Sequence, residues 1–432
     1  MKNKVILLSS LILISVCFNH VSAAGIYENA NQSAEFIRTL TRYASTDIDS
    51  AFYNPAGTVF REDGLYGYFS DQMLFDYQTM TDSSTILSDN SYPAQYKGEA
   101  MTWAFPDIYA IYKQDDWSAF LHMGLIGRGA AATYEKSIPL VNKAVALLIP
   151  SDTTDYRLEA YAYFIGMTLG GAYKISEIFS VGGAVRYVHA EQNILVKYNF
   201  TDTAQNIDVN VDADGNSCGI IGSFDIKPVN SINIGFRYQY YTVMNVKNEK
   251  PNSFKGPQLL IGNPMFGLTE GAKTKMTLPM NASTGISWMI IPELKVELGY
   301  IYYFNKLAEW GEAADGKDAA GKYDNGYDAS IAFEYAFIEQ LRASIGYSHS
   351  VSGVNSETRN NQMLGLDANT FGIGGTYTFG NGVEITLGTM VVVFKDTTET
   401  NPYIGGIIPD NGSTKYEDRT YSVAGSVSYK FM

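Results

Sequence analysis

The sequence predicts an all-β fold, a transmembrane antiparallel β-barrel of about 14 strands. Three observations predict this fold. Apolar and polar residues alternate with a period of two in many segments, and the connections between these segments alternate between short and long. After the first residues, no run of about 18 apolar residues could form a membrane-spanning helix.

The N-terminus predicts a secretory signal peptide over residues 1–23. Lys2 and Lys4 precede an apolar stretch, and Val21-Ser22-Ala23 provides the small residues of a cleavage site. Cleavage would leave 409 residues with one cysteine, Cys218, so an internal disulfide is excluded. The remaining 29 basic and 45 acidic residues give a formal net charge of −16, which argues against nucleic acid as a partner.

Residues 24–60 precede the first predicted strand, and they contain the motif Asp49-Ser50-Ala51-Phe52-Tyr53-Asn54-Pro55-Ala56-Gly57. Pro55 fixes its own φ, Asn54 before it is disfavoured in helical geometry, and Gly57 permits a tight reversal. We therefore expect the turn Asn54 to Gly57 to end a helix over residues 33–46 and to direct the chain into the wall. The alternative is an ordinary turn before a strand, but residues 24–60 are long for a bare tail.

The barrel is expected over residues 61–432, with no linker that would divide it. Its strands have one apolar face with aromatic ends and one small, polar face, which is typical of strands that cross both interfaces of a bilayer. The clearest apolar faces are Ala329, Ile331, Phe333, Tyr335 and Phe337; Phe371, Ile373, Tyr377 and Phe379; and Tyr421, Val423, Val427, Tyr429 and Phe431.

Connection lengths support the same topology, because short turns are expected on the periplasmic side and long loops outside. The short turns fall at 113–116, 174–177, 227–230, 290–293, 337–340 and 379–382. The long, acidic and Gly-rich connections fall near 81–99, 134–157, 199–217, 247–273, 308–325, 352–368 and 396–419. Within the second of these, residues 141–149 predict a short apolar helix, either as core packing or as an external patch that captures a lipophile.

The motif resembles that of the FadL/TodX family of outer-membrane transporters for long-chain fatty acids and other hydrophobic compounds. The other residues that carry the resemblance are Ala24-Gly25 before an apolar residue, Trp103, Pro106, Trp117 and Leu278-Pro279. The resemblance implies that residues 24–60, before the first strand, form an N-terminal helical hatch that plugs the barrel lumen. It also implies that Ile26, with Tyr27 beside it, occupies an apolar lumen pocket until ligand enters, and that ligand leaves sideways through a gap in the wall.

Strand parity places Arg128, Arg186, Arg237 and Arg342 inside the lumen. A buried guanidinium could bind the carboxylate head group of a ligand through paired hydrogen bonds. The alternative is that these arginines pair with inward acids and hold the hatch in place; the candidate acids are Glu297, Glu334, Asp47 and Asp49.

The third strand contains Gly127 and Gly129 in a run of small residues, where a kink or bulge could create the lateral opening. The alternative is that these small residues simply pack against the hatch.

No catalytic set, metal site or cofactor is expected. The three mature histidines, His122, His189 and His349, show no metal spacing. Asp212-Ala213-Asp214-Gly215-Asn216 lacks the distal glutamate of a calcium loop and is expected to be an acidic hairpin loop.

The sequence therefore predicts a monomeric, non-enzymatic barrel in the outer membrane of a bacterium, surrounded by lipid, that takes up hydrophobic molecules such as long-chain fatty acids. The alternative function is that of an adhesin or receptor that binds external molecules through its long acidic loops.

Overall fold

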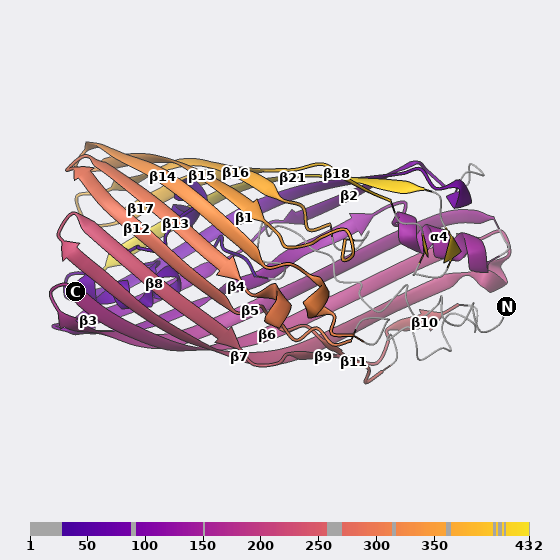
Figure 1. The fold of residues 1–432 in the computed structure, drawn as a ribbon, viewed down its shortest axis with the longest axis horizontal. Coiled ribbons are helices and arrows are strands. Elements are labelled where there is room, and N and C mark those ends of the chain that lie inside the picture. The colour runs from indigo at the N-terminus through magenta and orange to yellow at the C-terminus, as the bar shows by residue number, and fades with distance from the viewer. Residues whose placement is uncertain are drawn as a thin grey trace.

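In the computed structural model, the described part of the chain forms a closed antiparallel barrel with its first segment inside (Figure 1). The structure describes residues 28–87, 92–149, 152–256, 270–312, 317–359, 364–400, 403–404, 408–409 and 412–431. Within these residues no helix is long and apolar enough to cross a membrane. The expected signal peptide lies outside the described residues.

Fourteen wall strands can be followed around the ring through the described residues, as the sequence predicts. They are β1 (Gly64–Asp82), β2 (Gln95–Thr102) with β3 (Asp107–Gln114) as one broken strand, β4 (Trp117–Tyr134), β5 (Thr153–Ser176), β6 (Phe179–Phe200), β7 (Ile207–Val229), β8 (Ile232–Tyr241), β12 (Asn281–Ile291), β13 (Leu294–Tyr303), β14 (Gly326–Ile338), β15 (Leu341–Val351), β16 (Ala368–Thr378), β17 (Glu384–Phe394) and β21 (Ser413–Lys430). The last strand pairs with the first from Tyr66–Lys430 to Asp82–Thr414, which closes the barrel.

The alternating faces have the predicted orientation. Phe333, Phe371 and Tyr421 are each exposed on the outer surface, whereas Ser422 and Ala424 between the outer residues of β21 are buried. Aromatic side chains gather at both ends of the outer face, for example Phe75 against Trp103 and Tyr112 against Trp117. Outward apolar residues thus meet lipid while small polar residues leave room for the hatch.

All six predicted short turns lie at one end of the barrel, together with the C-terminus (Figure 1). The opposite end carries the longer connections and their small elements. These are η2 (Thr85–Leu87), α4 (Pro139–Leu148), η3 (Thr203–Gln205), β9 (Asn245–Asn248), β10 (Ser253–Lys255), β11 (Lys273–Lys275), η5 (Asn305–Leu307), η6 (Ala320–Lys322), β18 (Thr397–Thr400), β19 (Tyr403–Ile404) and β20 (Ile408–Pro409). The helix expected within 134–157 is α4.

One predicted long loop is wrong. Residues 199–217 are mostly strand, because β6 continues to Phe200 and β7 begins at Ile207. Ile207, Val209 and Val211 alternate inward and are buried, so this hairpin extends the barrel wall beyond the region of short strands. The expected acidic hairpin loop at 212–216 is therefore a paired part of β7.

The hatch consists of α2 (Ala34–Thr39), α3 (Ser50–Tyr53) and the 3₁₀ helix η1 (Pro55–Phe60). The predicted helix over 33–46 begins correctly, since Ser33 caps α2 through the Phe36 amide, but it ends at Thr39. Leu40 adopts a left-handed conformation with φ of 59°, and its backbone amide donates a hydrogen bond to the Phe36 carbonyl. The chain leaves helical geometry there because Arg42 and the residues after it form a polar loop of their own.

Candidate ligand site and hatch contacts in the lumen

The motif at 49–57 forms hydrogen bonds both to other residues of the hatch and to the barrel wall. Asn54 leaves helical geometry, with φ of −148° and ψ of 70°, and Pro55 begins the following 3₁₀ helix. The Asn54 side-chain amide donates to the Ser45 carbonyl and to Asp225 on β7. The Ala56 amide donates to the Ser223 hydroxyl at 2.9 Å, and the Ser180 hydroxyl donates to the Ala56 carbonyl at 2.7 Å. The turn is therefore fastened to β6 and β7.

Gly57 has a different role from the one predicted. Its backbone does not require the left-handed region. A Cβ at this position would instead lie 2.5 Å from the Ser45 carbonyl oxygen and from the Asn54 side-chain nitrogen. Glycine is therefore needed for close approach of two hatch segments.

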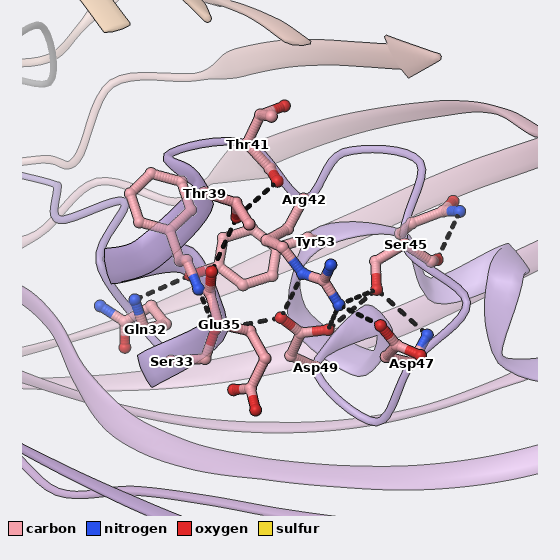
Figure 2. A network of polar contacts seen from close by, with 12 residues as sticks. Gln32, Ser33, Glu35, Thr39, Thr41, Arg42, Ser45, Asp47, Asp49 and Tyr53 are labelled. Atoms are coloured by element: carbon pink, nitrogen blue, oxygen red, sulfur yellow. Dashed lines mark hydrogen bonds and ion pairs between the residues drawn. The ribbon is translucent and has the colours of Figure 1, made fainter. Parts of the chain in front are cut away.

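Arg42 organises the interior of the hatch (Figure 2). Its guanidinium makes paired hydrogen bonds to both oxygens of Asp49, at 2.8 and 2.9 Å, and further bonds to Ser45 and Asp47. Asp49 also accepts from Ser33, the cap of α2. Arg42 and Asp49 are completely buried, and removing one partner of such a pair costs roughly 3–5 kcal/mol. Asp49 thus links the motif to the start of α2.

A second set of charges holds the hatch to the wall. Arg38 of α2 pairs with Glu334 on β14 and donates to the Ser344 hydroxyl on β15 at 2.8 Å. Arg42 lies 3.6 Å from Glu297 on β13. The acids named from the sequence are therefore used in ion pairs, but mainly with arginines of the hatch.

Inward glycines of several wall strands lie against the backbone of α2 and of the loop after it. We call these wall glycines the glycine track. A Cβ at Gly346 would overlap the Thr39 carbonyl oxygen, and one at Gly235 would overlap the Tyr43 carbonyl oxygen. The other glycines whose added Cβ would meet residues 34–44 closely are Gly285, Gly299, Gly372, Gly374 and Gly388. The small residues predicted for the inner faces of the strands therefore allow the hatch backbone to pack directly against the wall.

Arg186 and Arg237 lie together in the lumen beside Phe52 of the motif. Their guanidinium carbons lie 4.6 and 5.2 Å from the centroid of the Phe52 ring, and Arg237 donates to the Phe52 carbonyl at 2.6 Å. Arg186 donates to the Thr168 hydroxyl at 2.7 Å and to the Gln239 side-chain oxygen at 2.8 Å. Two buried, positively charged groups are therefore oriented by one aromatic ring and neutral polar side chains.

Glu28 is a buried carboxylate beside this pair, and sequence reasoning missed it. The side-chain amides of Asn281 and Gln239 donate to its two oxygens at 2.6 and 2.7 Å, and Arg186 Nη1 lies 4.0 Å away. Burial raises the pKa of the Glu28 carboxyl, because the charges of Arg237 and Arg186 offset the loss of solvation only in part.

The other two predicted arginines are placed elsewhere. Arg342 is partly exposed and lies 3.4 Å from Glu384 and 3.8 Å from Glu334, which fits the ion-pair alternative. Arg128 belongs to β4, and its side chain lies outside the described part. Ile26 and Tyr27 also lie outside the described residues.

The wall is interrupted between β4 and its neighbour on the side of β2 and β3. Pairing of β3 with β4 ends at Asp107–Gly124, and among the described residues β2 pairs with β4 at Glu99–Thr133 and Ala100–Ala132. On its other side, β4 pairs with β5 with register shifts between Leu125 and Gly127 and between Arg128 and Ala131. Gly127 and Gly129 therefore lie within or beside the segments where the β4–β5 register shifts.

The hatch forms hydrogen bonds to backbone carbonyl groups of β4 at this interruption. The Asn29 amide donates to the Ile126 carbonyl at 2.8 Å, and the Gln32 side-chain amide donates to the Leu125 carbonyl at 2.8 Å. These contacts satisfy carbonyl groups at the point where the β3 ladder has ended.

Comparison with known proteins agrees with this architecture. Residues 14–431 match the family described as outer membrane protein transport protein (OMPP1/FadL/TodX). The fold is similar to that of a Pseudomonas aeruginosa FadL homologue, with a TM-score of 0.71 at 13% identity over 95% of this chain and 100% of that one.

Two toluene transporters have similar folds. TodX of P. putida gives a TM-score of 0.59 at 12% identity, and TbuX of Ralstonia pickettii gives 0.55 at 14% identity; each match covers 89% of this chain and 94% of the other. No curated protein sequence matches significantly.

The closed barrel with an internal hatch and the match over nearly the whole chain define an outer-membrane transport protein for hydrophobic compounds. The chain belongs to the FadL/TodX family. Members of this family are transport channels rather than enzymes, and they are located in the outer membrane.

Proposed function

We propose that the compound carried by this protein is a long-chain fatty acid. The observation that supports this proposal is the pair of buried guanidinium groups, Arg186 and Arg237, inside the lumen. A carboxylate head group can form charge-assisted hydrogen bonds with guanidinium groups, whereas a neutral hydrocarbon cannot.

The wall beyond the arginines suits an acyl chain. Going from Arg186 toward the end with long connections, the inward residues of β6 are Val188 and Ala190, and those of the facing β5 include Phe164 and Ala162. All four are buried. A fatty acid would therefore lie with its head group at the arginines and its tail toward the external side.

Aromatic hydrocarbons are the second candidate, because TodX and TbuX are toluene transporters with the same fold. Such a ligand would use the apolar wall but would gain nothing from the arginine pair. The adhesin or receptor alternative depends on the acidic connections alone, and family membership favours transport.

Replacing Arg186 by Met separates the two ligand classes. A hydrogen bond to a charged group contributes about 1.5–3 kcal/mol, so oleate uptake by cells that express the variant should fall about tenfold or more, while toluene uptake should change little. Both would be measured with radiolabelled substrate at matched amounts of heat-modifiable protein in the outer membrane. An equal loss for both substrates would mean that Arg186 acts structurally and that the ligand needs no carboxylate.

Ile26, with Tyr27 beside it, is proposed to occupy the apolar pocket in the absence of ligand and to leave when ligand competes for the same volume. Replacing Ile26 by Asp should alter fatty acid binding strongly, because a charge is disfavoured in an apolar pocket, while the amount of assembled protein should stay the same. Equilibrium binding in a nonionic detergent would test this, and unchanged affinity would argue against the plug.

The ligand is proposed to leave sideways into the membrane through the interruption beside Gly127 and Gly129. An apolar molecule would then avoid the aqueous periplasm. The broken ladder between β4 and the strand formed by β2 and β3 supports this route, and its test is given in the Discussion.

A further inference from the structure

We infer that Glu28 is an internal substitute for the ligand's carboxylate: it occupies the head-group site formed by the wall, and an incoming carboxylate must displace it. This inference rests on the proposed function, because it concerns the same lumen site. It adds the group that occupies the site before ligand binds, and the competition by which that group affects carboxylate ligands and not neutral ones.

The first support is the origin of the groups around Glu28. The donors to its carboxylate, Asn281 and Gln239, belong to β12 and β8, and Arg186 belongs to β6. The Tyr241 hydroxyl, also on β8, lies 3.4 Å from Glu28 Oε1, the oxygen to which Gln239 donates. The wall alone therefore supplies a cluster of donors and positive charge, and the hatch segment supplies the anion.

The second support is that Glu28 satisfies this cluster incompletely. Nη2 of Arg186 and Nε of Arg237 are buried and have no hydrogen-bond acceptor within the part of the chain that the structure describes. Arg186 is completely buried and Arg237 is 4% exposed. Buried guanidinium donors without acceptors are costly, so a carboxylate placed closer to both arginines would be bound more favourably than Glu28.

The third support is the way in which the rest of the hatch is held. The hatch is bonded to the wall from Asn29 onward: the Asn29 amide donates to the Ile126 carbonyl on β4, and later residues are bonded to β6, β7 and β14. Phe52 orients the arginines from within that bonded part. Glu28 lies directly before Asn29, so rotation of its side chain can withdraw the carboxylate while these contacts stay in place.

The charge of the occupant decides which ligands are affected. A carboxylate ligand can bind the arginines only in the fraction of molecules from which Glu28 has withdrawn. Its apparent Kd is therefore the intrinsic Kd divided by that fraction. A neutral ligand with the same tail does not need the arginines, and its affinity should depend only weakly on Glu28. The site thus discriminates carboxylates from alcohols and hydrocarbons of equal length.

The test compares palmitate with hexadecanol on the purified full-length mature protein in a nonionic detergent, by displacement of a hydrophobic fluorophore. Replacing Glu28 by Ala should lower the Kd for palmitate about tenfold and change that for hexadecanol less than about twofold. Glu28→Gln, which keeps the size of the side chain and removes its charge, should shift palmitate in the same direction.

Glu35→Gln is the matched control. Glu35 is another buried carboxylate of the hatch, but it accepts hydrogen bonds from Tyr68 and Ser426, on β1 and β21. Its replacement should leave the ratio of the two affinities unchanged. In an Arg186→Met background, Glu28→Ala should no longer strengthen palmitate binding, because the charge that both carboxylates share has been removed.

Equal strengthening of palmitate and hexadecanol by Glu28→Ala would show that Glu28 only fills space, and this would overturn the inference. No strengthening of palmitate, or no palmitate binding even in the Glu28 variants, would overturn it as well. The proposed function fails in a different way: palmitate binding would respond to Glu28 as expected, but fatty acid uptake by cells would not depend on the protein.

Discussion

Deletion of residues 24–55 is expected to leave an assembled barrel with an open, ion-conducting lumen. Each wall strand is paired with wall strands on both sides, apart from the interruption at β4, and residues 28–60 of the hatch contribute no strand to the ring. Outside this interruption the wall strands satisfy one another's backbone groups, and at the interruption water can replace the hatch donors to the Leu125 and Ile126 carbonyls, so the wall needs no plug to remain closed in lipid. The inner face left by the deletion is rich in small and polar residues, so water would replace the hatch.

Single-channel recording in planar bilayers would measure this change as a rise from a closed to an open-pore conductance. Assembly would be monitored separately, by anomalous migration of unheated protein on a denaturing gel. If the deletion variant fails to assemble at all, the hatch is a structural part of the wall, and the division into a 24–60 hatch and a 61–432 barrel is wrong.

A single substitution should reproduce part of this effect. Val at Gly346 would place side-chain atoms where the Thr39 carbonyl oxygen lies, so α2 would have to leave the glycine track. Val at Gly222 is the matched control, since an added Cβ there meets nothing within 4 Å. Gly346→Val should raise the conductance of assembled barrels, whereas Gly222→Val should not.

The wall could be predicted from the sequence because its determinants are local. Period-two alternation fixes which residues face lipid, and the short turns fix where each pair of strands reverses. The failure at 199–217 has the same origin: Ile207, Val209 and Val211 continue the alternation, but the acidic residues among them favour a loop when only composition is considered.

The lumen could be predicted only in part. Strand parity correctly places Arg186 and Arg237 inside, and Asn54 and Pro55 mark a break in helical geometry. Parity does not reveal that Glu28 meets residues more than 200 positions away on β8 and β12, because no sequence spacing relates the hatch to those strands. The early end of α2 was missed for a similar reason, since it depends on the hydrogen bonds of Arg42.

Replacing both Gly127 and Gly129 by Val is expected to reduce fatty acid uptake several-fold while leaving binding in detergent intact. β-Branched residues favour a continuous strand and fill the space that glycines leave, so the two register shifts in β4 should diminish and the interruption beside β3 should narrow. Uptake would be followed with labelled oleate in cells, and binding with the purified variant.

Three readouts separate the lateral route from simple packing of small residues against the hatch. If the glycines only accommodate the hatch, their replacement should displace it, and both conductance and binding would change along with uptake. If they form an exit, conductance should stay closed and binding should stay normal while uptake falls, and Gly222→Val should leave all three unchanged. Normal uptake in a correctly assembled double variant would place the exit elsewhere, because a ligand that passes between β4 and β3 must cross the segment that the two valines occupy.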